Sequence, residues 1–151
     1  MDFSHSIALR RGRFSEPGRL YLLTTVTQDR VPFFTHFHLA RLVVDQFRRA
    51  QQERSAQSLA WVVMPDHFHW LVELQDVTLK TLMRRVKSQS TRRVNHACGR
   101  AGRLWQQGFH DRALRHEDDV RAVARYIVMN PLRAGLVKRL GDYPHWDAVW
   151  L

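Results

Sequence analysis

The sequence predicts an α+β fold, a single domain in which helices pack on one antiparallel sheet, and three observations carry this prediction. Two strand-like runs, SLAWVVM and HFHWLVEL, are separated only by Pro65 and Asp66, and so short a connector joins antiparallel strands. Two longer segments repeat apolar residues at the spacing of an amphipathic helix. The 151 residues contain no tandem repeat or low-complexity linker, so one domain is expected over residues 1–151.

The first elements are a strand and a helix. Residues 20–27, LYLLTTVT, are rich in β-branched and aromatic side chains, which favour strands, and the QDRVP that follows indicates a turn. Residues 37–54 place apolar side chains on one side and arginine and glutamine on the other, as an amphipathic helix does. This helix is expected to cover the sheet with its apolar face.

The hairpin of residues 58–64 and 67–74 comes next, and a second helix follows it. Residues 78–97 again repeat apolar side chains at helical spacing. After a stretch with glycines, residues 109–115 predict a short strand. The order is then strand, helix, strand, strand, helix, strand (βαββαβ), which is that of the ferredoxin-like fold. In this fold the helices cover one face of the antiparallel sheet, and the other face is expected to be free.

A third helix is added after these six elements. It is expected to begin near HEDDV, residues 116–120, because acidic side chains are favourable at a helix N-terminus. It is expected to run to about Asn130, and Pro131 marks the end of regular helix because proline lacks the backbone N–H that a continuing helix uses. This added C-terminal helix carries Tyr126.

The charge of the chain indicates a polyanionic partner, with nucleic acid as the first candidate. Lysine and arginine number 24 against 14 acidic residues, for a formal net charge of +10. Residues 80–103 hold eight basic residues and no acidic one, and Lys80, Arg84 and Lys87 share one face of the second helix. The alternative is an ordinary solvated face. The residues predicted to contact DNA phosphates are Lys80, Arg84, Arg85, Lys87, Arg92 and Arg93.

Cysteine content and hydropathy indicate the compartment. Cys98 is the one cysteine, which excludes an intramolecular disulfide and a cysteine-rich zinc site. The first residues lack the apolar core of a signal peptide, and the longest apolar run, LAWVVMP, is far shorter than a membrane span. We therefore expect a soluble, cytoplasmic protein with no membrane partner.

Two histidines stand one residue apart in the second strand of the hairpin. Residues two apart in a strand point to the same side, so His67 and His69 project together while Phe68 and Trp70 face the other way. If the aromatic side chains pack under the helices, both imidazoles stand on the free face and present two nitrogen ligands to one divalent metal. The alternative is a pair of surface or hydrogen-bonded histidines without a ligand.

The third helix carries two polar residues, Tyr126 and Asn130, that could face the histidine pair. They lie four apart, on the flank of the apolar stripe of that helix. A helix packed on the edge of the sheet would therefore offer a phenol and a carboxamide to the histidines. The alternative for Tyr126 is a partly buried packing residue whose hydroxyl is wet.

Three segments together carry a resemblance to a known family. VVMPDHFHWLVEL and ARYIVMNPLRAGLV, with GRLWQQGFHDRALR between them, resemble the REP-associated tyrosine transposases, where REP stands for repetitive extragenic palindrome. These are a branch of the single-tyrosine HUH transposases, in which U is a hydrophobic residue. The resemblance runs from about Tyr21 to Trp150.

The resemblance implies a metal-dependent nuclease and strand transferase that acts on single-stranded DNA beside REP-type hairpins. His67 and His69 would be metal ligands, Asn130 the third ligand and Tyr126 the nucleophile that forms a 5′-phosphotyrosine. The implied metal is Mg²⁺ or Mn²⁺, no nucleotide cofactor is expected, and the protein would act as a monomer or a homodimer. Two alternatives remain open at this point: a DNA-binding protein of this family that does not cleave, and an RNA-binding module that uses the free sheet face.

Several other residues have two possible roles. Trp105 and Phe109 either stack on unpaired bases or close the core. His110 and Asp111 either position the scissile strand or have a structural capping role. Glu73 is either an outer-shell partner of the histidines or a simple exposed residue. Arg133 either contacts a phosphate or caps the C-terminus of the third helix, where a cation is favourable.

Overall fold

The computed structural model describes residues 15–115 and 119–150. The predicted order of strands and helices is confirmed, and the boundaries of the first five elements differ from those expected by at most two residues. The elements are β1 (Leu20–Val26), the 3₁₀ turns η1 (Gln28–Arg30) and η2 (Phe33–Thr35), α2 (Phe37–Gln52), β2 (Ala56–Met64), β3 (His67–Leu74), α3 (Leu79–Cys98), β4 (His110–Ala113), α4 (Val120–Val128), α5 (Asn130–Arg133), the 3₁₀ turn η3 (Leu140–Asp142) and β5 (Trp146–Ala148).

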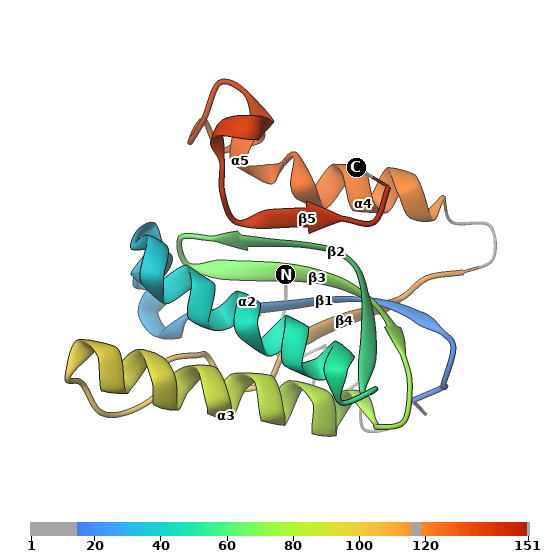
Figure 1. The fold of residues 1–151 in the computed structure, drawn as a ribbon, viewed down its shortest axis with the longest axis horizontal. Coiled ribbons are helices and arrows are strands. Elements are labelled where there is room, and N and C mark those ends of the chain that lie inside the picture. The colour runs from blue at the N-terminus through green and yellow to red at the C-terminus, as the bar shows by residue number, and fades with distance from the viewer. Residues whose placement is uncertain (1–14, 116–118, 151) are drawn as a thin grey trace.

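One five-stranded antiparallel sheet runs through the protein, with strand order β4-β1-β3-β2-β5 (Figure 1). The first four strands have the ferredoxin-like arrangement that the sequence predicts. The β2–β3 hairpin turns over two residues, because Met64 pairs with His67. The sequence reading missed β5, which pairs with β2 at the opposite edge from β4. A strand of three residues is too short to show a pattern of alternation.

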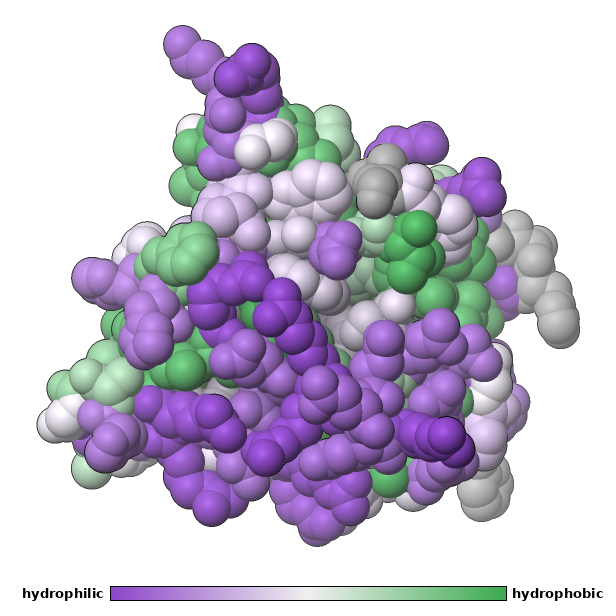
Figure 2. All heavy atoms as spheres, viewed as in Figure 1, coloured by the Kyte–Doolittle hydropathy of each residue, from purple (hydrophilic) through white to green (hydrophobic). Residues whose placement is uncertain are grey.

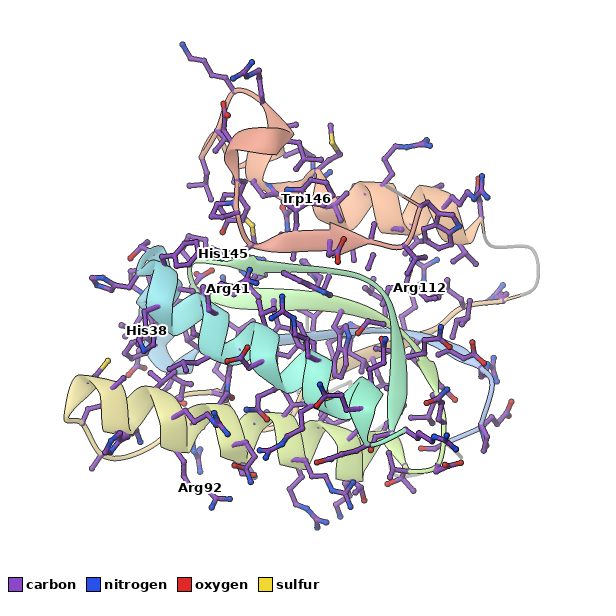
Figure 3. The ribbon with its side chains drawn as sticks, in the orientation of Figure 1. His38, Arg41, Arg92, Arg112, His145 and Trp146 are labelled. Carbon is purple, nitrogen blue, oxygen red and sulfur yellow. The ribbon has the colours of Figure 1, made fainter. Side chains whose placement is uncertain are left out.

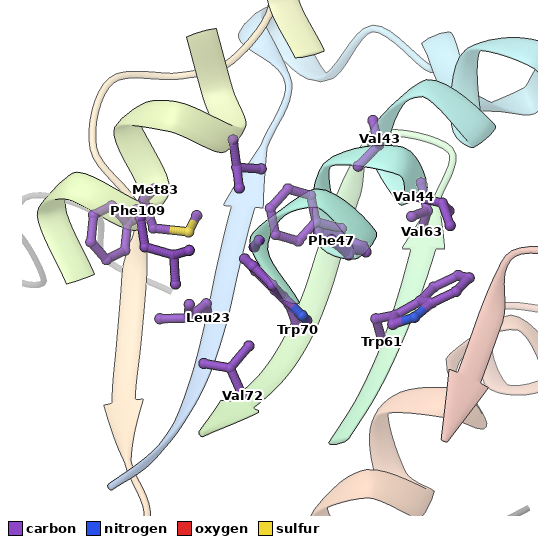
Figure 4. Packing of buried hydrophobic residues seen from close by; sticks show 14 of the residues in the cluster. Leu23, Val43, Val44, Phe47, Trp61, Val63, Trp70, Val72, Met83 and Phe109 are labelled. Atoms are coloured by element: carbon purple, nitrogen blue, oxygen red, sulfur yellow. The ribbon is translucent and has the colours of Figure 1, made fainter. Parts of the chain in front are cut away.

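Helices α2 and α3 pack on one face of the sheet and bury an aromatic core (Figure 4). The Phe47 ring of α2 stacks on the Trp70 ring at 4.6 Å between centroids and meets the Phe68 ring edge-on at 5.0 Å. The Trp70 indole N–H donates to Ser58 Oγ at 2.8 Å, so this core tryptophan keeps a hydrogen bond when buried. Phe68 and Trp70 therefore face the helices. This agrees with the alternation of side chains along β3, which puts His67 and His69 on the other side.

The second face of the sheet is also covered, so the expectation of a free face was wrong. Helix α4 packs against β2 and β5 on the side opposite α2 and α3 (Figure 1). Its buried residues Ala124, Ile127 and Val128 belong to the same hydrophobic cluster as Val62 and Leu71 of the sheet. The apolar stripe of α4 is visible in the sequence, but the stripe does not say which face of the sheet it will cover.

The third predicted helix is two helices in the structure. Its expected start at residues 116–118 lies outside the described residues, and α4 begins at Val120 with the Asp119 side chain accepting from Ala122 N at 3.1 Å. Helix α4 ends at Val128, and a new helix, α5, starts at Asn130.

Pro131 opens α5 instead of ending a helix, which corrects the sequence prediction. Proline suits the first turn, because the N–H groups there have no acceptor within the helix. At the other end Gly135 has φ of 74°, with its N–H donating to Leu132 O at 3.0 Å while Leu136 N donates to Pro131 O at 2.9 Å. This pair of bonds is a Schellman motif, which satisfies the last carbonyls of α5.

Hydrophilic side chains cover the outer surface of α2 and α3 (Figure 2). Arg92 extends from α3 away from the sheet (Figure 3). Within residues 15–115 and 119–150, no helix is long and apolar enough to cross a membrane.

Candidate functional site

The histidine pair lies on the face of the sheet that α4 covers. His67 and His69 alternate with the core residues of β3, and their ring centroids are 5.0 Å apart with the planes at 78°. The two imidazoles thus share one side of the strand, as their spacing predicts, and stand close enough to approach one ion.

Hydrogen bonds fix both imidazole rings through their Nδ1 atoms. His67 Nδ1 lies 2.7 Å from Asp66 Oδ1, and His69 Nδ1 lies 2.7 Å from Thr24 Oγ1. Burial alone would raise the pKa of Asp66, but the hydrogen bond and charge of His67, with the contact from Arg30, hold it below its ordinary value. An ionised carboxylate only accepts, so the Nδ1–H of His67 is the donor in this hydrogen bond, and Nε2 is the atom left to bind a metal.

The pKa of His69 is lowered to about 3. Burial is the largest cause, and the positive charges of His67, Arg133 and His110 lower the pKa further. His69 is therefore neutral at neutral pH, which is the form that binds metals. Two oriented imidazoles fit a divalent metal. Among the described residues no group of three or more His, Cys, Asp or Glu side chains is arranged to hold a metal. The further ligand that the resemblance implies is of another type, the Asn130 carboxamide.

Tyr126 lies on α4, on the same side of the sheet as the histidines. Its side chain is 65% exposed, so the alternative of a packing residue is wrong. The guanidinium carbon of Arg133 lies 3.8 Å from the centre of the Tyr126 ring, and the same charge contributes to the lowered pKa of His69 after burial and His67. The Arg133 guanidinium thus contacts the Tyr126 ring, and its charge also acts on His69.

Asn130 is the first residue of α5 and is half-buried. The expectation that one helix carries both Tyr126 and Asn130 was wrong, because the helix breaks at Met129 between them. Both residues still belong to the short α4–α5 segment that packs over β2.

The sequence reading missed Asp66 and Thr24 as partners of the histidines. Asp66 directly precedes His67, so its contact with that histidine could have been predicted from the sequence. Thr24 is 45 residues away and is brought opposite His69 only by the β1–β3 register. Glu73, the proposed outer-shell partner, lies four residues along the strand from His69, about 13 Å at the rise of a strand, so that reading was wrong.

Arg30 supports Asp66 from a turn with unusual backbone angles. Arg30 donates to Asp66 Oδ2 at 3.2 Å, and both Asp29 and Arg30 have φ in the left-handed region, at 57° and 52°. Side chains other than glycine adopt this region at a cost of about 1 kcal/mol each. The turn is held by Thr27 N donating to Asp66 O at 2.9 Å, which joins it to the hairpin that carries the histidines.

The basic residues of α3 lie on the opposite face of the sheet from the histidines, because α3 packs in the aromatic core. Arg84 and Arg92 border an open groove of about 660 Å³ between α3 and residues 103–108, with Arg103 on its other wall. Arg85 donates to Ser55 Oγ at 3.5 Å. The exposed members of the predicted DNA-contacting set are Lys80, Arg84, Arg85, Arg92 and Arg93.

Lys87 has a structural role that the charge pattern does not predict. Its ammonium group donates to the backbone carbonyls of Gln106 at 2.7 Å and Gly108 at 2.5 Å. These bonds tie the segment before β4 to α3. Lys87 therefore joins two parts of the fold, and its side chain is less exposed to solvent than that of Arg84.

Replacing Lys87 by Met is expected to lower the free energy of unfolding by about 2 kcal/mol, because hydrogen bonds to a charged group are lost and two carbonyls lose a donor. Urea denaturation followed by circular dichroism measures this. Arg92→Met on the same helix is the matched control and should change stability by less than about 0.5 kcal/mol. Equal effects of the two variants would contradict the structural role of Lys87.

Trp105 and Phe109 close the core and do not stack on bases. They are 2% and 4% exposed, and the Trp105 indole N–H donates to Ser90 Oγ at 2.9 Å. The core reading of these two residues is therefore confirmed. His110 is paired with Thr24 in the β1–β4 ladder, so it lies on the same face as His69.

The chain is similar in sequence to known proteins. The family described as transposase IS200 like matches residues 19–130. A REP-associated tyrosine transposase of Escherichia coli K12 is 33% identical over 112 residues, which are 73% of this chain and 63% of that relative, so the match spans less than two thirds of its length. A Haemophilus influenzae protein, named provisionally as a REP-associated tyrosine transposase, is 27% identical over 85% of this chain and 78% of its own.

A solved structure shares the fold as well. The structure of a REP-associated tyrosine transposase bound to a REP hairpin superposes with a TM-score of 0.73 at 27% identity. The superposition covers 89% of this chain and 79% of the other.

Proposed function

The chain belongs to the family of IS200-like transposases, and from this premise we propose that it cleaves and rejoins single-stranded DNA beside REP-type hairpins. The observation that carries the proposal is the oriented histidine pair with Tyr126 on the same side of the sheet. Each of these side chains is of the type that the reaction needs.

Tyr126 is proposed to act as the nucleophile. Its phenol oxygen forms a bond to the phosphorus of the scissile phosphodiester while the bond from phosphorus to the 3′ oxygen breaks. The phenol proton passes to solvent, and the leaving 3′ oxygen takes up a proton, so the products are a 5′-phosphotyrosine and a 3′-hydroxyl. Because one phosphoester replaces another, a 3′-hydroxyl can reverse the step and join a new strand.

His67, His69 and Asn130 are proposed to hold the divalent metal. A Mg²⁺ or Mn²⁺ ion held by these residues would supply Lewis-acid chemistry to the phosphate. Imidazole nitrogen suits manganese well, whereas magnesium prefers oxygen ligands and water, so Mn²⁺ is the better probe in vitro. Asp66 and Thr24 keep the two rings oriented before any ion arrives.

The basic surface of α3 is proposed to bind the phosphates of the hairpin. The exposed arginines line an open groove on the face opposite the histidines, so DNA bound to both must pass an edge of the sheet. The RNA-binding alternative needed a bare sheet face with aromatic rings. That face is covered by α4, and Phe68 is fully buried on the other side.

Replacing Arg84 and Arg92 together by alanine is expected to weaken hairpin binding and to reduce its salt dependence. Each lost phosphate contact lowers the slope of log K against log salt by about 0.9 for duplex DNA. Fluorescence anisotropy across a salt series measures both quantities. Arg48 and Arg49, on the outer side of α2, give a matched double alanine control. An unchanged slope in the α3 variant would remove this groove from the path of the DNA.

The proposed activity is tested with the full chain, Mn²⁺ and a labelled DNA hairpin with single-stranded flanks. We expect a DNA–protein adduct that survives a denaturing gel and requires the metal. An RNA hairpin of the same sequence serves as the comparison and should give none. Tight DNA binding without an adduct would instead establish the alternative, a binding protein that does not cleave.

A further inference from the structure

Arg133 contacts the face of the Tyr126 ring. Its guanidinium carbon lies 3.8 Å from the ring centre. Tyr126 is 65% exposed. A ring so exposed would sample several rotamers unless a neighbour limited it. Arg133 is that neighbour.

The break between α4 and α5 places Arg133 there. Met129 ends α4 and caps α5, and Arg133 N donates to Met129 O at 3.1 Å, so α5 is a single tight turn. The Schellman bonds of Gly135 and Leu136 already satisfy the carbonyls at its end. Capping therefore does not explain Arg133, whose guanidinium reaches back over a residue seven positions earlier.

The chemistry of the guanidinium suits a second contact at the same time. A guanidinium can stack on an aromatic ring, and such a contact leaves some of its five N–H donors to bind a phosphate in two-point fashion. Arg133, like Tyr126, belongs to the α4–α5 segment that packs over β2, on the side of the sheet that bears the histidine pair. One side chain can therefore touch the nucleophile and the group it attacks.

We infer that Arg133 is a positioning residue, which holds the Tyr126 ring in the attacking orientation and aligns the scissile phosphate against it. This inference rests on the proposed function and adds a residue to it. Planarity matters in this role as much as charge does, because only a flat group can stack on the ring and bind the phosphate at the same time.

Single-turnover formation of the covalent adduct tests the inference. Arg133→Ala is expected to slow the covalent step by about tenfold to a hundredfold, as a misplaced reacting group does, with hairpin affinity within about threefold of wild type. Arg133→Lys keeps the charge but not the flat shape and should recover only a small part of the rate. Arg125→Ala, which removes the same charge from the position next to Tyr126, is the control and should stay within about twofold.

An NMR measurement reports the contact without any activity. In the free protein, the side-chain protons of Arg133 should be shifted upfield by the Tyr126 ring, and Tyr126→Leu should abolish that shift. A wild-type adduct rate in Arg133→Ala, or full recovery by Arg133→Lys, would overturn the inference and leave the proposed function intact. Failure of the wild-type protein to form any adduct would overturn the proposed function itself.

Discussion

Tyr126→Phe is expected to abolish covalent attachment of DNA, with a loss of at least about a thousandfold in rate, while hairpin affinity stays near wild type. The phenol oxygen is the atom that forms the bond to phosphorus, and phenylalanine has nothing in its place. The ring itself is kept, so the stacking of Arg133 on it remains. The adduct is measured on a denaturing gel and the affinity by anisotropy.

Tyr143→Phe provides the matched control, because it removes a hydroxyl from a tyrosine with a structural role. The Tyr143 hydroxyl donates to Val63 O at 2.6 Å in the core beneath α4. Its loss should cost about 1 kcal/mol of stability and leave the adduct rate unchanged. Adduct formation by Tyr126→Phe at a wild-type rate would show that the nucleophile is another residue.

The second large effect is expected from the histidine pair. His67→Ala and His69→Ala should each lower the metal-dependent rate by at least about a hundredfold, because the remaining imidazole is a single nitrogen ligand. Asp66→Asn should be milder and weaken Mn²⁺ binding by about tenfold to a hundredfold, since it removes the ionised carboxylate that orients His67. Calorimetric titration with Mn²⁺ measures affinity, and the adduct rate across Mn²⁺ concentrations measures function.

His38→Ala is the control for this series. His38 is exposed on α2 (Figure 3), and the side of the sheet that α2 covers is not the one that bears the histidine pair. It should leave both Mn²⁺ affinity and adduct rate unchanged. If His67→Ala and His69→Ala bound Mn²⁺ as tightly as wild type, the proposed ligand set would be wrong.

Much of the fold could be predicted because its signals are local. The alternation in HFHWLVEL defines two sides of β3 within a few residues, and the two-residue connector before it allows only an antiparallel partner. The same alternation predicts that His67 and His69 share a side, which the structure confirms. The stripes of α2 and α3 likewise show which faces are buried.

The errors arose where a residue has two uses that look alike in sequence. Pro131 both ends helices and begins them, and only the arrangement of Met129 and Gly135 around it decides. Lys87 belongs to the same basic stripe as Arg84, yet its ammonium group binds carbonyls of a segment that the chain reaches about 20 residues later. The local sequence around Trp105 does not decide whether its side chain is exposed or buried.

The sequence by itself determined the types and order of the main elements, the side of β3 on which the histidines lie, and the position of a tyrosine on a later helix. The backbone geometry of strands and helices sets these features over a few residues. Only the tertiary structure decided that α4 covers the histidine face, that Thr24 meets His69, and that Arg133 lies on Tyr126. Those contacts depend on strand register and on how separate elements pack, and no local period in the chain encodes them.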